Sequence, residues 1–110
     1  REISEFAEKA KSGKLKAEEM QGGTFTVNNT GTFGSIQSYG IINYPQAAIL
    51  QIESIVKRPV IIDGMIAVRD MVNLCLSLDH RVLDGLICGR FLARLKEVLE
   101  NVDKETTSIY

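Results

Sequence analysis

The sequence has no tryptophan, one histidine, two cysteines and two prolines among its 110 residues. Cys75 and Cys88 each lie in an apolar stretch, so neither a disulfide framework nor a zinc site is expected. No apolar run approaches the roughly 18 residues that a membrane span needs. The segment 1–10 also lacks the apolar run of a signal peptide. These absences predict a soluble, cytoplasmic protein with no membrane segment and no metal.

Neither sign of charge prevails, because 13 Lys and Arg residues oppose 14 Asp and Glu residues and leave a net charge of −1. Such a balance does not favour nucleic acid or a membrane surface as a partner. With 45% hydrophobic and 25% charged residues, the chain has the composition of a globular domain. Its length supports one core and not two. Because it begins at Arg1, within an expected helix, we expect it to be part of a longer sequence.

The N-terminal half predicts a helix followed by two strands. Apolar residues at helical spacing predict a short amphipathic helix that ends before Gly13. After Gly22 and Gly23, alternation over 24–28 predicts a strand, and the glycines and small hydroxyl residues of 29–35 predict a loop. Segment 47–56 is apolar first and alternates later. That pattern predicts a strand that is buried on both faces and then emerges toward solvent.

The C-terminal half predicts a hairpin, a strand and a long helix. The β-rich runs 60–62 and 65–68 flank Asp63-Gly64, a pair typical of tight hairpin turns. A strand is predicted over 71–78, and an apolar stripe predicts a helix over 84–101. Residues 102–110 are polar, and we expect a loose tail there. The order of elements predicts an α+β sandwich with a mixed or antiparallel sheet and helices on one face.

His80 is the residue that most invites a chemical role. Imidazole is the side-chain group that gains or loses a proton near neutral pH, and this chain has only one. His80 lies where the predicted strand ends and before the predicted helix, and a rigid strand that delivers a side chain to an open loop is typical of catalytic sites. On spacing alone, a lone histidine is more often a surface or structural residue. Both interpretations stay open at this point.

Four blocks of the sequence resemble the dihydrolipoamide acyltransferases, which are the core subunits of 2-oxo acid dehydrogenase complexes. The signature His-x-x-x-Asp-Gly of that family occurs at His80, Asp84 and Gly85. The other blocks are 18–27, the turn Asn29-Thr30-Gly31 with Gly34, and 42–50. Segments 27–34 and 41–44 are most similar to the branched-chain members from Gram-positive bacteria.

The resemblance implies the C-terminal part of a catalytic domain, over residues 1–110, with the two-layer sandwich fold of chloramphenicol acetyltransferase. It implies a reaction that moves a branched-chain acyl group between dihydrolipoamide and coenzyme A. Coenzyme A and the lipoyl group are then substrates, the lipoyl attachment site lies outside this chain, and no metal takes part.

The resemblance also assigns roles to four residues. His80 is the general base that takes the proton of the attacking thiol, because the thiolate is the nucleophile. Asp84 is either a catalytic helper that favours the imidazolium or a structural residue, capping the helix or pairing with an arginine. Arg81 is a candidate for a structural ion pair. Asn28 stands where the family commonly has a hydroxyl that stabilises the oxyanion, and is the candidate for that function.

Family members form homo-oligomers built from trimers, with the active site between neighbouring subunits, and bind their dehydrogenase partners through domains absent here. We therefore expect this chain to be inactive alone and to self-associate through an exposed apolar face. Two alternatives stay open. One is a non-catalytic packing and oligomerisation module of a multienzyme core, and the other is an antibiotic acetyltransferase of the same fold.

Overall fold

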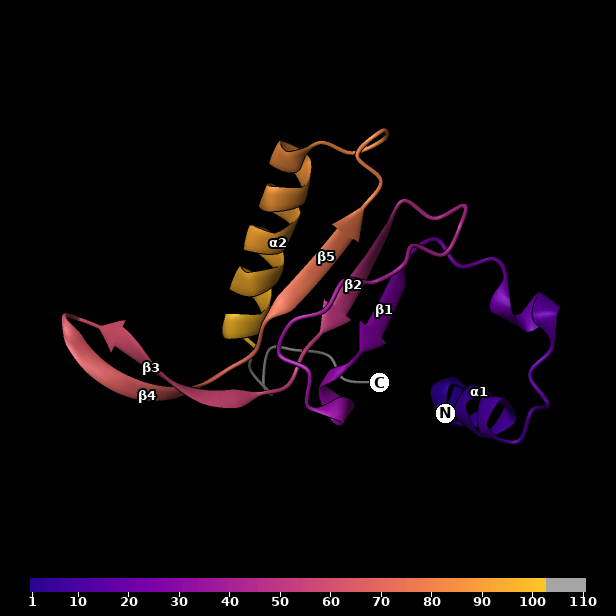
Figure 1. Cartoon of the computed structure of the whole chain (residues 1–110), viewed down its shortest axis with the longest axis horizontal. Coiled ribbons are helices and arrows are strands. Elements are labelled where there is room, and N and C mark those ends of the chain that lie inside the picture. Colours follow the sequence, from indigo (N-terminus) through magenta and orange to yellow (C-terminus); the bar gives the residue numbers. More distant parts are fainter. Residues whose placement is uncertain (103–110) are drawn as a thin grey trace.

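The computed structural model describes residues 1–102 (Figure 1). Val102 is exposed beyond the last helix, and the rest of the expected loose tail, 103–110, lies outside the described residues. Two α-helices, two short 3₁₀ helices and five strands follow one another along the chain. In order they are α1 (Glu2–Lys11), η1 (Ala17–Met20), β1 (Thr26–Asn29), η2 (Gly31–Phe33), β2 (Ala48–Ile52), β3 (Val56–Ile62), β4 (Met65–Met71), β5 (Leu74–Leu78) and α2 (Gly85–Glu100).

A three-stranded sheet with the order β1-β2-β5 forms the centre of the fold. β1 runs parallel to β2, and β5 runs antiparallel to it, so the sheet is mixed, as predicted. The register places Asn28 beside Gln51, and Gln51 beside Cys75. These three side chains therefore form one row across the same face of the sheet, because register partners point the same way.

The predicted hairpin is confirmed, but it forms a sheet of its own. β3 and β4 pair antiparallel around Asp63 and Gly64, whose φ values of 51° and 76° suit a tight turn between twisted strands. The hairpin projects away from the three-stranded sheet as an arm (Figure 1). The strand expected over 71–78 is consequently divided, since Met71 ends β4 and Leu74 begins β5.

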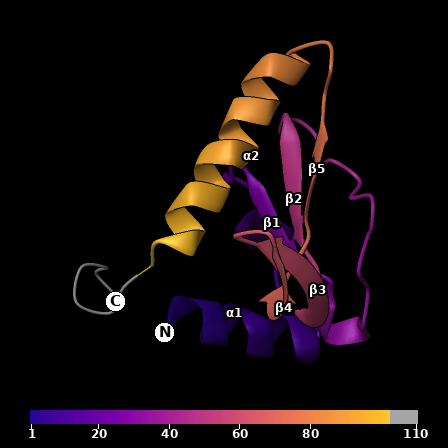
Figure 2. The same ribbon diagram turned by 90° about the vertical axis from the view of Figure 1, so that its left-hand side faces the viewer.

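Helix α2 lies against one face of the three-stranded sheet (Figure 2). Its Cys88 is buried, and the ring of Phe91 packs at 5.9 Å from that of Phe25, just before β1. Helix α1 stands beside the sheet instead, and none of its residues is buried. The predicted α+β sandwich is thus confirmed, with α2 alone forming the second layer over the described residues.

The core is centred on β2, where Ala48, Ile49 and Leu50 are buried. β2 ends at Ile52, and segment 47–56 emerges toward solvent only at Ile55, which is 71% exposed, because Gln51 and Glu53 are still only 5% and 2% exposed. The reason lies outside the strand. Segment 35–40, called the covering segment below, lies against this face. It is so close that a Cβ on Gly40 would lie 2.8 Å from a methyl carbon of Ile49.

Much apolar surface stays open. The accessible surface is 9392 Å², against about 6,100 Å² for a compact monomer of 12.2 kDa. The radius of gyration is 16.8 Å, where a compact chain of this length has about 13 Å. Exposed side chains of α1, the β3–β4 hairpin and α2 account for part of the excess, among them Ile3, Ile61, Met65, Ile66, Val68, Leu86 and Ile87. These surfaces are available for association.

Candidate active site

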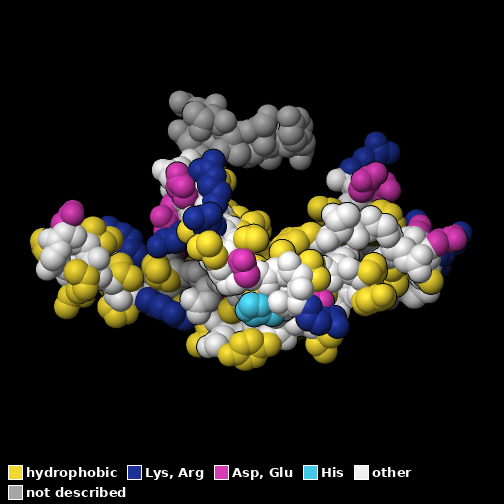
Figure 3. Space-filling model, turned by 90° about the horizontal axis from the view of Figure 1, so that it is seen from above, with side chains coloured by type: hydrophobic (Ala, Val, Ile, Leu, Met, Phe, Trp, Pro, Cys, Tyr) yellow, Lys and Arg dark blue, Asp and Glu magenta, His cyan; other side chains and the backbone are white. Residues whose placement is uncertain are grey.

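His80 lies in a tight turn that joins β5 to α2. The backbone carbonyl of Asp79 accepts hydrogen bonds from the N–H groups of Val82 and Leu83, both at 3.0 Å. The N–H of Asp79 donates to the carbonyl of Ala47 at 2.8 Å, which ties the turn to the start of β2. Backbone hydrogen bonds of its neighbours therefore fix the turn that carries the only histidine, while His80 itself is exposed on the surface (Figure 3).

An ion pair flanks His80 on both sides in sequence. The guanidinium of Arg81 donates from Nε and Nη2 to the two carboxylate oxygens of Asp79 at 3.0 and 2.9 Å, and its backbone N–H donates at 3.1 Å. The hydrogen bonds from Arg81 hold the pKa of Asp79 below its ordinary value. Arg81 is thus in an ion pair, and Asp79 is the partner that the sequence did not single out.

His80 lines a shallow hollow of about 380 Å³. The segment before β2 supplies its other wall, although it lies more than 30 residues away in sequence. Gln46 of that wall is fixed by a side-chain hydrogen bond with Thr26 of β1. The hollow is lined by Ile42, Tyr44, Gln46, Leu78, Asp79, His80 and Arg81. The structure therefore brings together two of the blocks that carry the family resemblance.

Asp84 is the N-cap of α2. Its carboxylate Oδ1 accepts a hydrogen bond of 2.8 Å from the backbone N–H of Ile87. This bond satisfies one of the free donors in the first turn of the helix. Among residues 1–102, no arginine forms an ion pair with Asp84. Its role as a catalytic helper stays a prediction.

Replacing Asp84 separates the two interpretations of this residue. Asp84→Ala is expected to lower the free energy of unfolding by about 0.5–2 kcal/mol, whereas Asp84→Asn, which still caps, is expected to keep most of it. Urea unfolding of both variants checks this. If Asp84 also favours the imidazolium by its charge, as the resemblance implies, Asp84→Asn in the longer protein will lower kcat for acyl transfer without loss of stability. An unchanged kcat in Asp84→Asn would limit the residue to capping.

Asn28 lies far from His80 within one chain. It is exposed on β1, in register with Gln51 and through it with Cys75 of β5. Two strand spacings and three residues along β5 separate Asn28 from Leu78, which places their backbones about 14 Å apart. His80 lies two residues further, beyond the strand end. The structure therefore does not bring these two predicted site residues together.

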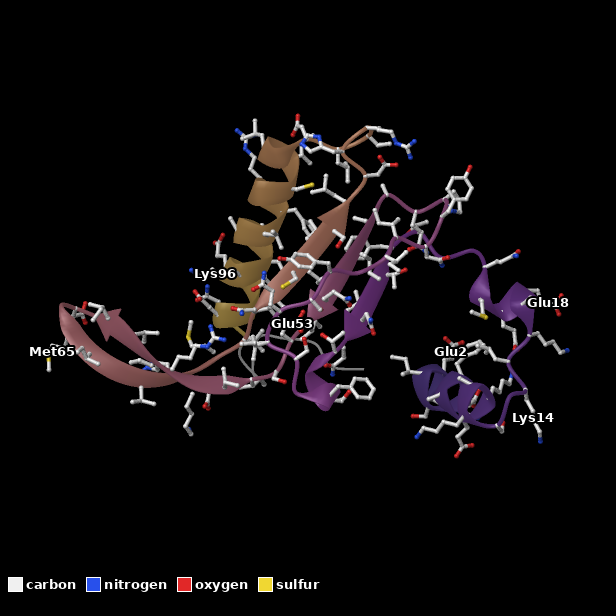
Figure 4. All side chains as sticks on the ribbon, in the orientation of Figure 1. Glu2, Lys14, Glu18, Glu53, Met65 and Lys96 are labelled. Atoms are coloured by element: carbon white, nitrogen blue, oxygen red, sulfur yellow. The ribbon has the colours of Figure 1, made fainter. Side chains whose placement is uncertain are left out.

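Glu53, which the sequence did not single out, is a buried carboxylate just after β2 (Figure 4). Its two oxygens accept hydrogen bonds from the hydroxyls of Ser38 and Thr30, the second at 2.6 Å. These two bonds lower the pKa of Glu53 and outweigh the opposite effect of burial. The carboxylate thereby joins the end of β1 and the covering segment to β2. A glutamate within the alternating part of segment 47–56 was the available signal for this cluster.

The lowered pKa of Glu53 predicts a loss of stability in acid. Because folding lowers the pKa from its ordinary value of 4.5, the charged carboxylate stabilises the fold at higher pH. That contribution is fully present above pH 4.5 and is lost as the pH falls through the folded-state pKa. We expect the melting temperature to drop between pH 5 and pH 3, and to drop less in Glu53→Gln. Glu97→Gln, in an exposed ion pair with Arg94 on α2, is the matched control and should change this slope little. An equal slope in Glu53→Gln would contradict the assignment.

Within residues 1–102, no helix is both long and apolar enough to cross a bilayer. The same residues contain no group of three His, Cys, Asp or Glu side chains that could hold a metal ion. The absence of a metal from the reaction stays a prediction.

The sheet with α2 on one face, and an open histidine turn between the last strand and that helix, define the class of acyltransferases with a chloramphenicol acetyltransferase-like fold. Residues 1–106 match the family described as 2-oxoacid dehydrogenases acyltransferase (catalytic domain), and the chain belongs to that family. The chain is 74% identical to the lipoamide acyltransferase component of the branched-chain alpha-keto acid dehydrogenase complex of Bacillus subtilis (strain 168). The match covers 100% of this chain and 26% of that protein, so the chain spans about a quarter of this relative. The predicted likeness to the branched-chain type is confirmed.

Solved structures agree with this assignment. A probable dihydrolipoamide acetyltransferase from Listeria monocytogenes 4b F2365 superposes with a TM-score of 0.92 and 70% identity over 100% of this chain and 47% of its own. Two more have a TM-score of 0.84 and 42% identity over 91% of this chain and 41% of theirs. One is the cubic core of the pyruvate dehydrogenase multienzyme complex, so homologues of the chain form such cores. The other is the Azotobacter vinelandii dihydrolipoamide acetyltransferase, in which a serine, a histidine and an asparagine were studied for their roles in the catalytic mechanism. The histidine and the asparagine are four residues apart in that enzyme.

Proposed function

We propose that this chain is the C-terminal part of the catalytic domain of a branched-chain lipoamide acyltransferase. In this proposal the enzyme moves a branched acyl group between dihydrolipoamide and coenzyme A, and His80 is the general base. The observation that supports it best is the histidine turn, which holds an exposed imidazole beside a hollow, four residues before the cap of α2. The same spacing separates the histidine and the asparagine studied in the Azotobacter vinelandii enzyme.

The chemistry follows from the acidity of thiols. A thiol with a pKa near ~8.5 is mostly protonated at neutral pH, so neutral His80 accepts its proton as the sulfur attacks the thioester carbonyl. The new carbon–sulfur bond turns the carbonyl oxygen into an oxyanion. When this intermediate collapses, the original carbon–sulfur bond breaks and the imidazolium returns the proton to the departing thiolate. One thioester and one thiol are consumed, and one of each is formed.

In this proposal the oxyanion is stabilised by Asn28 of a neighbouring copy. A base and an oxyanion donor must each lie about 3 Å from atoms of one small reacting group. The Asn28 side chain stands roughly perpendicular to the sheet, so it does not close the gap of about 14 Å between its backbone and that of Leu78 within the same chain. The open apolar surfaces support an assembly of several copies. A trimer-based core, dehydrogenase partners bound through other domains and a cytoplasmic location stay predictions.

Acyl transfer from an acyl-coenzyme A to dihydrolipoamide tests the proposal. The full-length enzyme, meaning the longer polypeptide that we propose this chain belongs to, is expected to be active. The 110-residue chain alone is expected to be inactive and to have a mass in solution above the 12.2 kDa of one copy, measured by light scattering. A folded, inactive full-length enzyme would favour the packing-module alternative, which the open apolar surface also supports. Nothing in the family assignment favours an antibiotic acetyltransferase.

A further inference from the structure

The two faces of the three-stranded sheet differ in chemistry. Ala48 and Leu76 point toward α2 and line an apolar gap with Cys88. Residues on the opposite face alternate with these, and there the sheet carries a polar row of Asn28, Gln51 and Cys75. The segment at Gly40 covers the middle of this row, since a Cβ on Gly40 would lie 3.0 Å from the side-chain nitrogen of Gln51.

Gln51 is a buried amide with an unused acceptor. The residue is 5% exposed, and its Oε1 has no hydrogen-bond partner among the residues described. Leaving such an oxygen unpaired costs about 1–3 kcal/mol, so buried acceptors are nearly always bonded. Glu53, on the same face, has both of its oxygens bonded. Stability therefore does not explain a glutamine at position 51, because an apolar side chain of similar size would avoid the cost of the unpaired oxygen.

The strand neighbour of Gln51 carries the matching donors. Asn28 is its register partner on the parallel strand β1, where neighbouring backbones lie about 4.8 Å apart. The amide of Asn28 has two N–H donors, and no side-chain hydrogen bond of Asn28 is present within 1–102. Side chains that lie opposite each other on neighbouring strands are close enough to interact directly.

We propose that Gln51 is a positioning residue for Asn28. Its Oε1 accepts one N–H of the Asn28 amide, which fixes the plane of that amide and leaves the second N–H directed at the developing oxyanion. The bond is not made in the structure and forms in the working enzyme. An oxyanion donor stabilises the transition state when it is aimed before the reaction begins, and an asparagine is longer and freer than a hydroxyl on Cβ. This inference rests on the proposed function, because the role of Asn28 belongs to it.

A double-mutant cycle in the full-length enzyme tests the inference. Gln51→Met removes the acceptor and keeps the volume, and we expect kcat for acyl transfer to fall about 10-fold with KM within twofold. Asn28→Ala should lower kcat about 100-fold, and Gln51→Met should then add no further loss. In the Asn28→Ser background, where the hydroxyl needs no alignment, adding Gln51→Met should leave kcat unchanged.

The melting temperature of Gln51→Met should not fall, because an unpaired acceptor has been removed. Gln37→Met, on the exposed part of the covering segment, is the matched control and should leave kcat unchanged.

The outcomes distinguish this inference from the proposed function. Additive losses in Gln51→Met and Asn28→Ala would overturn the positioning role. A fall in melting temperature that accounts for the lost activity of Gln51→Met would also overturn it, since the role would then be structural. Full activity in Asn28→Ala would mean that Asn28 is not the oxyanion donor. That result would overturn the positioning role of Gln51 but would leave His80 as the base. Full activity in His80→Ala overturns the proposed function itself.

Discussion

Replacing His80 with alanine in the full-length enzyme is expected to lower kcat for acyl transfer by about 10²–10⁴-fold, with little change in KM for either thiol substrate. A positioned general base contributes a factor of this size. His80 is the only histidine, so no second imidazole in this chain can replace it. Its ring makes no hydrogen bond within residues 1–102 and is exposed, so its loss removes a proton acceptor and not a structural contact. The measurement is steady-state kinetics with acyl-coenzyme A and dihydrolipoamide.

Val82 provides the matched control for this experiment, because it lies in the same turn and is 69% exposed. Val82→Ala should retain kcat within twofold and should melt at the temperature of the unchanged enzyme. His80→Ala should also melt at that temperature. Turnover at the normal rate in His80→Ala would mean that thiol deprotonation does not depend on this imidazole. In that case solvent or another residue would have to take the proton.

Local sequence signals predicted the elements whose causes are local. The hairpin depends on Asp63 and Gly64, which adopt the positive φ values that their pair favours. The last helix begins after its cap at Asp84 and ends at Glu100, within one residue of the expected range of 84–101. Capping and turn geometry involve neighbours in sequence, so a single sequence contains the information that they need.

Features that depend on contacts between distant segments were not predictable in this way. The burial of Gln51 and Glu53 depends on a covering segment that precedes β2, and alternation alone did not show that segment 47–56 emerges only at Ile55. The division between the hairpin and the three-stranded sheet depends on which strands pair, and periodicity does not encode pairing. For the same reason the sequence identified His80 and Asp84 by motif but missed Gln46 and Glu53, whose hydrogen-bond partners lie in other elements. Asp79 was missed although its partner, Arg81, is only two residues away.

Gly31 begins η2, separated from the end of β1 by one residue, and there is no room for a side chain at this position. A Cβ at this position would lie 2.7 Å from the carbonyl oxygen of Glu53 and 2.9 Å from the backbone nitrogen of Ser54. Both obstacles are backbone atoms, so a side-chain rotation cannot relieve them. The backbone of Gly31 is itself fixed, because its carbonyl accepts the hydroxyl of Ser54 at 2.8 Å and its N–H donates to Asn29 at 3.0 Å. Gly31→Ala therefore requires the end of β1 to move away from β2.

We expect Gly31→Ala to lower the free energy of unfolding by about 2–3 kcal/mol, the upper part of the range for overpacked sites. Urea unfolding of the chain measures this. Gly89→Ala is the matched control, since it makes the same chemical change inside α2, where no atom lies within 4 Å of the new Cβ, and it should raise stability by about 0.5–1 kcal/mol. Equal unfolding midpoints for Gly31→Ala and the unchanged chain would show that β1 is free to shift against β2.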